Sequence, residues 1–200
     1  RDRLDEYDHN VRIRQLTGTI LPGQAYYKAQ KLRAALRQEV SEALERFDVA
    51  LEQSPDHRGA LMGRALVYLQ AERYIEAEAE FTYLIKFLKA NLEPDDITGV
   101  AVYAAAYANR GTMYNRLGCR PGGTSQHFEK ALADYIQALN IDEGAIEGPN
   151  LVNRIIYGTP RPSTIRLRAV YMVKQMALPE PERLLCVPEK DAEQRMYKPF

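Results

Sequence analysis

Residues 104–143, AAAYANRGTMYNRLGCRPGGTSQHFEKALADYIQALNIDE, decide the fold of this 200-residue chain. Small and apolar residues recur at spacings of three and four on both sides of a polar segment, as on the buried face of an α-helix. Gly118 is expected to end the first helix, because glycine readily adopts the backbone conformation of a helix C-terminus. The segment CRPGGTSQH that follows combines helix breakers with polar residues, which is typical of a surface loop. The stretch therefore predicts two helices joined by an enlarged turn.

The residues expected on the facing sides of these two helices are Tyr107, Gly111, Tyr114, Phe128, Ala131, Tyr135 and Ala138. A looser version of the pattern lies upstream at residues 58–90, with AERY as the turn. Its second helix is expected to continue until Pro94 stops it. Small Ala65 and Ala77 suit close helix contact, since a larger side chain would push the axes apart. The residues expected to be buried in this pair are Leu61, Ala65, Tyr68, Ile75, Ala77, Phe81 and Leu84.

Residues 24–52 form a third helical segment, which has no internal Gly or Pro and ends at Ser54-Pro55. Periodicity alone does not decide between one long helix and two packed helices. Comparison with the two downstream segments favours two helices, with a break near residues 37–39. The residues expected on one face of the second half are Val40, Ala43, Leu44, Phe47, Ala50 and Leu51.

The three segments share one spacing of small and large residues. The matching sets are Ala43, Phe47 and Ala50, then Ala77, Phe81 and Leu84, then Ala131, Tyr135 and Ala138. From Ala43 to Ala77 is 34 residues, and a helix–turn–helix unit with this period resembles the tetratricopeptide repeat, TPR. Asn109-Arg110-Gly111 carries the best match, and Gly63-Arg64-Ala65 is its degenerate counterpart.

The resemblance covers residues 24–143, about three units, and an atypical C-terminal helical pair is expected at 144–178. The first helix of that pair would start at Pro149 and the second would occupy 163–178. The apolar stripe of the second is expected to comprise Leu167, Val170, Tyr171 and Met176. The predicted organisation is an N-terminal arm or capping helix (1–23), a TPR-like helical-repeat domain (24–178) and a proline-punctuated C-terminal tail (179–200).

The resemblance implies an all-α fold, a right-handed α-α superhelix of antiparallel helix pairs whose first helices line a concave groove. The family uses this groove mainly to hold an extended peptide or a helix of another protein. By matching positions, the expected groove residues are Lys28, Leu32, Met62, Leu66, Asn109, Thr112, Asn115 and Arg116. For the apolar members Leu32 and Leu66, a place in the core is the alternative.

One subset of the family grips the C-terminal carboxylate of chaperone tails with a cluster of Lys, Asn and Arg. Lys28 matches this cluster, but Leu32 stands where the Asn is expected and the middle unit offers Met62-Gly63. We therefore expect no carboxylate clamp. A mostly apolar to neutral groove favours a hydrophobic peptide or helix instead.

The 118–127 loop is the other singular feature, because insertions in repeats lie on one face and often serve binding. Arg120 and His127 are its candidate partner contacts, with a neutral insertion as the alternative. Cys119 and His127 are too few ligands for a zinc site, so no metal is predicted. The two cysteines are interpreted as ordinary thiols, and a Cys119–Cys186 bridge that ties the tail to this loop is the alternative.

The charge balance and the missing motifs exclude several classes of function. The 27 basic and 27 acidic residues give a formal net charge of zero, without the basic stripe of a nucleic-acid-binding protein. No apolar run approaches the roughly 20 residues that span a bilayer. The sequence has no phosphate-binding loop, nucleophile elbow or paired-histidine metal motif, so neither an enzyme nor a cofactor is predicted. A cytoplasmic and an exported, periplasmic setting both stay open.

The predicted function is a non-catalytic protein–protein interaction module, an adaptor or scaffold that binds a peptide or helix of a partner protein in its groove. The alternative is a structural assembly subunit that self-associates through its helical ends or its C-terminal tail. In that alternative the tail fills the groove of its own or a neighbouring chain.

Overall fold

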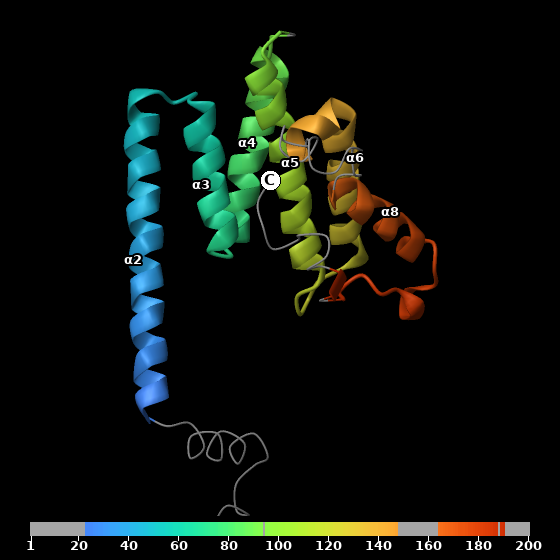
Figure 1. Ribbon diagram of the computed structural model, residues 1–200, viewed down its shortest axis with the longest axis horizontal. Helices are drawn as coiled ribbons and strands as arrows, with labels where there is room; N and C mark the ends of the chain where they lie inside the picture. Colours follow the sequence, from blue (N-terminus) through green and yellow to red (C-terminus); the bar gives the residue numbers. More distant parts are fainter. Residues whose placement is uncertain (1–22, 94, 148–163, 188, 191–200) are drawn as a thin grey trace, which may run out of the picture. The chain divides into compact units, whose positions relative to one another are not determined.

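The computed structural model describes residues 23–93, 95–147, 164–187 and 189–190, and within these ranges the chain is helical without any strand (Figure 1). The elements are α2 (Gly23–Gln53), α3 (Arg58–Gln70), α4 (Tyr74–Asn91), α5 (Ile97–Gly118), α6 (Ser125–Glu147), α8 (Thr164–Met176) and the 3-10 helix η2 (Glu180–Glu182). The chain divides into two compact units, residues 1–43 and 44–200. Residues 1–22 of the arm predicted at 1–23, and the start of the helix predicted at Pro149, lie outside the described residues. The all-α prediction is confirmed for the described part.

Helix α2 is continuous over 31 residues, so the predicted break near residues 37–39 is wrong. No Gly or Pro interrupts this region, and Arg37, Gln38 and Glu39 all have good helix propensity. The Gln38 side chain donates a hydrogen bond to Glu42 Oε1 at 2.9 Å, one turn further along the helix. The first predicted repeat is therefore one helix and not a helix pair.

Helices α3 and α4 form the predicted middle pair. His57 Nδ1 accepts a hydrogen bond from the Ala60 amide at 3.0 Å and caps the start of α3. Helix α4 continues to Asn91, as the position of Pro94 predicts. Ile75 is 84% exposed, which contradicts its predicted burial. It lies in the first turn of α4 on the side away from the buried residues Ala77, Phe81, Leu84, Ile85 and Leu88.

Helices α5 and α6 form the predicted downstream pair, and α5 ends at Gly118 as expected. Helix α5 begins at Ile97, before the quoted stretch, because Asp96 Oδ1 accepts a hydrogen bond from the Gly99 amide at 2.7 Å. Gly111 lets the two helices approach closely, since a Cβ atom there would lie 2.7 Å from the Tyr135 ring. The backbone of α6 is non-helical at Asp142, where φ is −166°.

Helix α8 confirms the predicted final helix but buries a different face. Its buried residues are Ile165, Arg168, Ala169 and Met172. Leu167 and Val170 of the predicted stripe are 42% and 48% exposed. The reason is Arg168, a charged residue whose burial the apolar pattern could not show, because its guanidinium is hydrogen bonded inside the protein.

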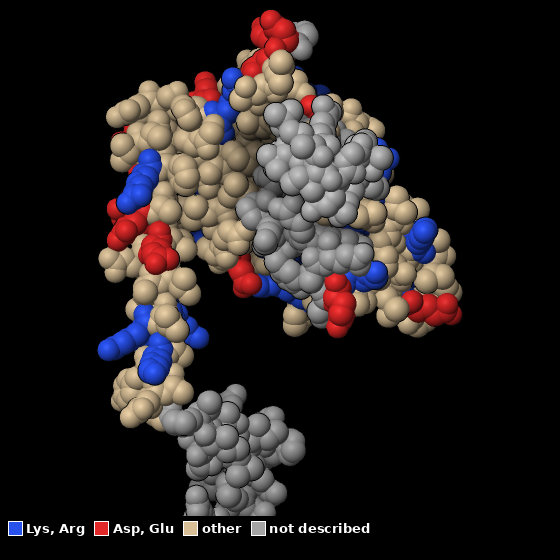
Figure 2. All heavy atoms as spheres, in the orientation of Figure 1, with Lys and Arg blue, Asp and Glu red and all other residues tan. Residues whose placement is uncertain are grey.

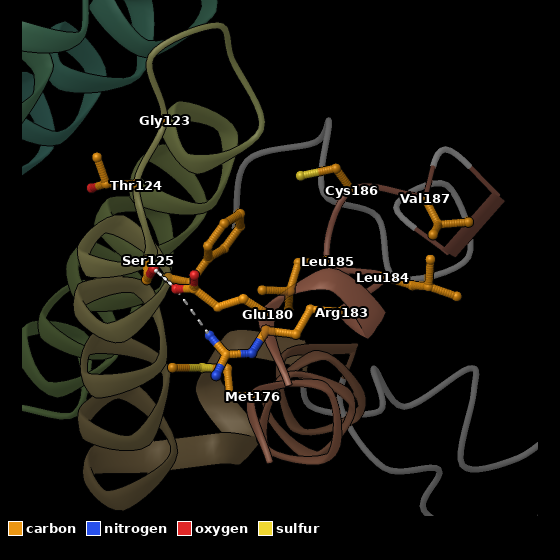
Figure 3. Close-up of a pocket in the computed structure, with 11 residues that line it drawn as sticks. Gly123, Thr124, Ser125, Met176, Glu180, Arg183, Leu184, Leu185, Cys186 and Val187 are labelled. Carbon is orange, nitrogen blue, oxygen red and sulfur yellow. Dashed lines mark hydrogen bonds and ion pairs between the residues drawn. The ribbon is translucent and has the colours of Figure 1, made fainter. Parts of the chain in front are cut away.

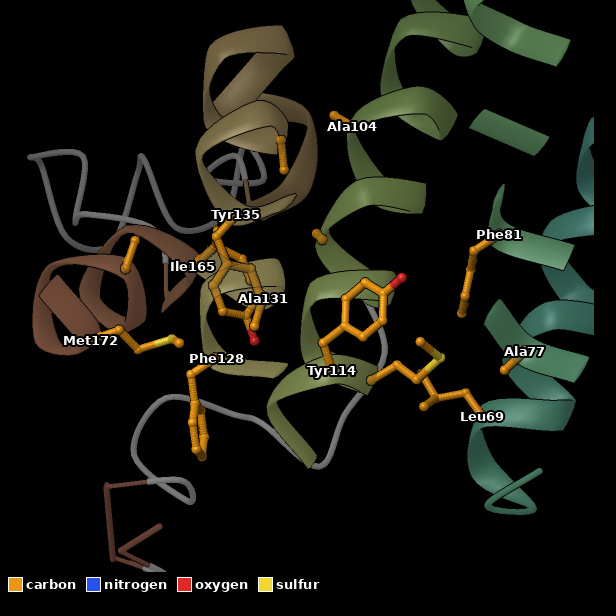
Figure 4. Packing of buried hydrophobic residues seen from close by; sticks show 14 of the residues in the cluster. Leu69, Ala77, Phe81, Ala104, Tyr114, Phe128, Ala131, Tyr135, Ile165 and Met172 are labelled. Carbon is orange, nitrogen blue, oxygen red and sulfur yellow. The ribbon is translucent and has the colours of Figure 1, made fainter. Parts of the chain in front are cut away.

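The largest core cluster contains buried residues of α3, α4, α5, α6 and α8 and of the segment that follows α8 (Figure 4). Tyr135 and Ala131 of α6 lie beside Ile165 and Met172 of α8. Leu185, which follows η2, is 7% exposed and belongs to the same cluster. The start of the predicted C-terminal tail therefore packs along the helical body.

Candidate functional site

The predicted groove residues do not lie on one open surface. Lys28 and Leu32 are exposed on α2, in the unit of residues 1–43. Met62 and Leu66 are half-buried on α3 and pack against the core. Lys28 and Leu32 lie on the continuous helix α2. They are therefore not part of a helix pair such as α3/α4 or α5/α6.

The predicted polar groove residues of α5 are buried, which corrects the expectation that they face an open surface. Asn109 and Thr112 are 0% exposed and Asn115 is 1% exposed. Asn109 Nδ2 donates to the Ala105 carbonyl at 2.8 Å, and Thr112 Oγ1 donates to the Ala108 carbonyl at 3.0 Å. Arg116 is half-buried. These side chains therefore bond within the chain.

The chain's own C-terminal segment covers this end of α5. Arg168 Nη2 of α8 donates to Asn115 Oδ1 at 2.7 Å and to the Leu185 carbonyl at 2.8 Å. The Arg168 guanidinium is 0% exposed, so it depends on such acceptors for its stability in the protein interior. One arginine thus joins α5, α8 and the segment after η2.

A disulfide bond fixes the same segment to the loop after α5. Cys119 and Cys186 are bridged, with their Cα atoms 5.5 Å apart and a sequence separation of 67 residues. The interpretation as two ordinary thiols is therefore wrong, and the alternative of a bridge between the tail and the loop is confirmed. The bridge restrains the segment next to Leu185 against the helical body.

The predicted loop contacts are used within the chain. Arg120 forms an ion pair with Glu72 and lies over the Tyr74 ring, 4.7 Å from its centroid. His127 Nδ1 accepts a hydrogen bond from the Thr124 amide at 3.1 Å, at the start of α6. The loop therefore connects the turns of two successive helix pairs. A partner contact of Arg120 or His127 stays a prediction.

Two arginines at equivalent positions form the networks that sequence reasoning missed. Arg64 of α3 donates to Glu80 of α4 and to Asp48 of α2, both at 2.8 Å. Arg110 of α5 donates two hydrogen bonds to Asp134 of α6, at 2.7 and 2.8 Å.

Arg110 also donates to Thr82 of the preceding helix at 3.0 Å. Each arginine thus joins its own helix pair to the helix before it. The sequence signal for these two networks was an arginine that directly precedes a small residue, in Gly63-Arg64-Ala65 and in Asn109-Arg110-Gly111.

The Arg110 network is more buried than the Arg64 network. The Arg110 and Asp134 side chains are 16% and 8% exposed. Burial lowers the pKa of Arg110, but the hydrogen bonds and charge of Asp134 outweigh it, so the net pKa is raised. Burial raises the pKa of the Asp134 carboxyl against the opposing effect of Arg110. The ion pair therefore carries a desolvation cost that its hydrogen bonds offset.

A pocket of about 610 Å³ lies where the C-terminal segment meets the start of α6 (Figure 3). Ser125 Oγ donates to Glu180 Oε1 at 2.9 Å, and Arg183 Nε donates to the Leu178 carbonyl at 2.8 Å. The pocket is lined by Gly123, Thr124, Ser125, Phe128, Met176, Glu180, Arg183, Leu184, Leu185, Cys186 and Val187.

Comparisons with known proteins assign no family to this chain. No protein-family model matches it, and neither a curated protein nor a solved structure matches it. In the part of the chain that the structure describes, no helix has the length and apolar character needed to cross a membrane. The same described residues contain no group of three or more side chains that could hold a metal ion.

Proposed function

We propose that this chain is a non-catalytic protein-interaction module, a right-handed TPR-type superhelix that binds a helix or extended peptide of a partner protein. The observation that carries the proposal is the contact between the end of α5 and the chain's own C-terminal segment. There, Arg168 of α8 bonds to Asn115 of α5 and to the carbonyl of Leu185 in the extended segment, while α8 itself packs on α6. The half-buried surface of α3 around Met62 and Leu66 would take a segment of another protein in a comparable way.

The repeated arginine network supports a repeat architecture independently of this contact. Arg64 and Arg110 each join a helix pair to the preceding helix, Arg64 through the Asp48 carboxylate and Arg110 through the Thr82 hydroxyl. Successive pairs held in one relation to each other form a continuous surface along their first helices, and repeat proteins bind partners on such surfaces. Half-buried apolar side chains on α3 favour an apolar segment as the ligand.

The test is affinity capture from the source cell, followed by binding measurements with the purified captured protein. Leu66→Glu places a charge on the proposed surface and is expected to weaken binding by about tenfold or more. Ile136→Glu is the matched control, because Ile136 is an exposed apolar residue on the second helix of a pair. Circular dichroism and thermal melting verify that both variants are folded.

Equal binding by the wild type and Leu66→Glu would contradict the proposal, as would loss of binding with Ile136→Glu alone. Acidic-tailed chaperone peptides provide a second comparison. We expect no tight binding of these peptides and no effect of Lys28→Ala, because Lys28 lies on the continuous helix α2 without the remaining clamp residues.

A further inference from the structure

The pocket of about 610 Å³ beside the start of α6 has an apolar wall that is held in the core. The Phe128 ring lies against Gly118, where a Cβ atom would be 2.6 Å from the ring. Phe128 and Leu185 are 8% and 7% exposed and belong to one core cluster, and Met176 at the end of α8 packs against that cluster. These side chains therefore line the pocket with apolar surface and are not free to collapse into it.

The other side of the pocket is the segment of residues 184–187, whose backbone is held in place by separate bonds. The Leu184 amide donates a hydrogen bond to Gln175 Oε1 at 2.8 Å, and the Leu185 carbonyl accepts one from the buried Arg168. The disulfide bond ties the same segment to the loop after α5. Leu184 is nevertheless 61% exposed at the edge of the pocket. A preformed pocket with apolar walls is the usual form of a small-molecule site.

The side chains of Ser125, Glu180 and Arg183 meet at this pocket (Figure 3). Ser125 donates its hydroxyl to one oxygen of Glu180, whose carboxylate can accept further hydrogen bonds. The bond from Arg183 Nε to the Leu178 carbonyl orients the guanidinium. Arg183 Nη1 lies 3.8 Å from Glu180 Oε1, too far for a hydrogen bond. The two charged groups are therefore neighbours that are not hydrogen bonded to each other.

The charges around the pocket are mixed in sign. Figure 2 shows acidic side chains at η2 and basic side chains on the neighbouring α8. A ligand with only a carboxylate would be attracted by Arg183 and repelled by Glu180, and a simple amine would meet the reverse situation. A ligand with a carboxylate and an ammonium group on one carbon atom presents an opposite charge to each residue.

We propose that this pocket binds a free α-amino acid with a large apolar side chain. The ligand carboxylate pairs with the Arg183 guanidinium, whose planar donors match a carboxylate, and the ammonium group donates to Glu180. The apolar side chain of the ligand contacts Met176 and covers Leu184. This inference goes beyond the proposed function, because it concerns the pocket beside α6 and not the surface of α3.

The test is isothermal titration calorimetry of the full chain with small probes that each lack one group of L-phenylalanine. L-Phenylalanine itself is expected to bind with a Kd of about 1 mM or tighter. L-Alanine, without the large side chain, and 2-phenylethylamine, without the carboxylate, should bind about tenfold more weakly or worse. 3-Phenylpropanoate, without the ammonium group, should bind about threefold more weakly, because Glu180 is 73% exposed and Arg183 only 23%.

Substitutions in the pocket assign each charge of the ligand. Arg183→Gln should weaken the binding of L-phenylalanine about tenfold and remove its advantage over 2-phenylethylamine. Glu180→Gln should make L-phenylalanine and 3-phenylpropanoate bind with equal affinity. The matched control is Glu182→Gln, an exposed carboxylate of the same 3-10 helix that does not line the pocket, and it should bind like the wild type. Circular dichroism verifies that the variants are folded.

Lack of L-phenylalanine binding at about ten times the expected Kd overturns the inference. Equally tight binding of 3-phenylpropanoate and L-phenylalanine to the wild type also overturns it, since the pocket would then be a site for carboxylates alone. So do equal effects of Glu180→Gln and Glu182→Gln. Leu66→Glu, which tests the proposed function, should leave amino-acid binding unchanged, so the failure of one proposal is distinguishable from the failure of the other.

Discussion

The two helix pairs α3/α4 and α5/α6 follow one plan, but the second is also bonded to the C-terminal segment through Asn115, Ser125 and the loop residue Cys119. Both contain an arginine that joins the pair to the helix before it. Arg64 is 23% exposed and divides its hydrogen bonds between two carboxylates, whereas Arg110 binds one carboxylate through two bonds and is 16% exposed. Arg168 and the disulfide bond then add bonds to α5 and to the loop that follows it, and Leu185 packs in the core cluster that contains α5 and α6. Substitutions at equivalent positions of the two pairs are therefore expected to lower the unfolding free energy by different amounts.

The largest expected difference concerns the carboxylates of the two networks. Asp134→Ala leaves the Arg110 guanidinium mostly buried without its ion pair, which should cost about 3–5 kcal/mol of unfolding free energy. Glu80→Ala leaves Arg64 paired with Asp48 at a more exposed site, and about 1 kcal/mol or less is expected. Urea unfolding followed by circular dichroism measures both values.

The control is Arg110→Met/Asp134→Leu, which removes both charges. It is expected to be more stable than Asp134→Ala, since no unpaired charge stays in the interior. Equal costs for Asp134→Ala and Glu80→Ala would mean that the deeper burial of the second network contributes nothing to stability.

The next effect in size comes from the Cys119–Cys186 bridge, which the first pair lacks. Cys119→Ser/Cys186→Ser should lower the unfolding free energy by about 2–4 kcal/mol, because the bridge restricts the unfolded chain over a long loop. Hydrogen exchange should rise in η2, in residues 183–187 and at the end of α5, and little in α3 and α4.

Reduction of the wild type with a thiol reagent should reproduce the double variant. Uniform exchange through all helices in the double variant would indicate that the bridge acts only on global stability and does not hold the segment locally.

A smaller effect is expected where the two pairs place a glycine and an alanine at equivalent positions. Gly111→Ala puts a Cβ atom 2.7 Å from the Tyr135 ring and should cost about 1–3 kcal/mol. Ala65→Gly removes a buried methyl group and lowers helix propensity, with an expected cost of about 1–2 kcal/mol.

Combining Gly111→Ala with Tyr135→Leu tests the cause of the first cost. If ring contact is responsible, the two substitutions are less destabilising together than the sum of their separate effects. Additive effects would locate the strain elsewhere in α5.

Much of this fold follows from local patterns in the sequence. The small and large residues that pack within a pair, such as Ala77 with Phe81 and Ala131 with Tyr135, are spaced by helix geometry, so their burial could be predicted. The ends of α4 and α5 follow from Pro94 and Gly118. By contrast, nothing in residues 37–39 breaks a helix, and a break was expected only by analogy with the later units.

The candidate site was harder to predict because its residues are joined over long sequence separations. Asn115 is buried by Arg168, 53 residues away, and that contact has no periodic signal. An apolar pattern also assigns a buried arginine to the surface. The buried face predicted for α8 therefore differs from the observed one. Cys119 and Cys186 allowed two interpretations, and only the fold brings them together.

The smallest expected effect concerns Tyr114, whose hydroxyl donates a hydrogen bond to Glu78 Oε1 at 2.6 Å. Burial and this hydrogen bond raise the pKa of Tyr114, and burial and Tyr107 raise the pKa of Tyr103 to about 12. Since the folded pKa values are raised, unfolded tyrosines with a pKa of about 10 lose their protons first as the pH rises. Stability should therefore be intact below pH of about 10 and decline above it.

Tyr114→Phe removes one of the tyrosine ionisations that cause this decline in stability. At neutral pH it should cost about 1 kcal/mol through the lost hydrogen bond to Glu78. Above pH of about 10 the unfolding free energy of Tyr114→Phe should fall less steeply than that of the wild type. In the wild type the unfolded chain ionises the Tyr114 phenol while the folded protein keeps it protonated, and the variant has no such phenol. Urea unfolding across this pH range measures both slopes. Parallel slopes would mean that the Tyr114 phenol ionises equally in both states and that the contact between the two helix pairs at Glu78 opens readily.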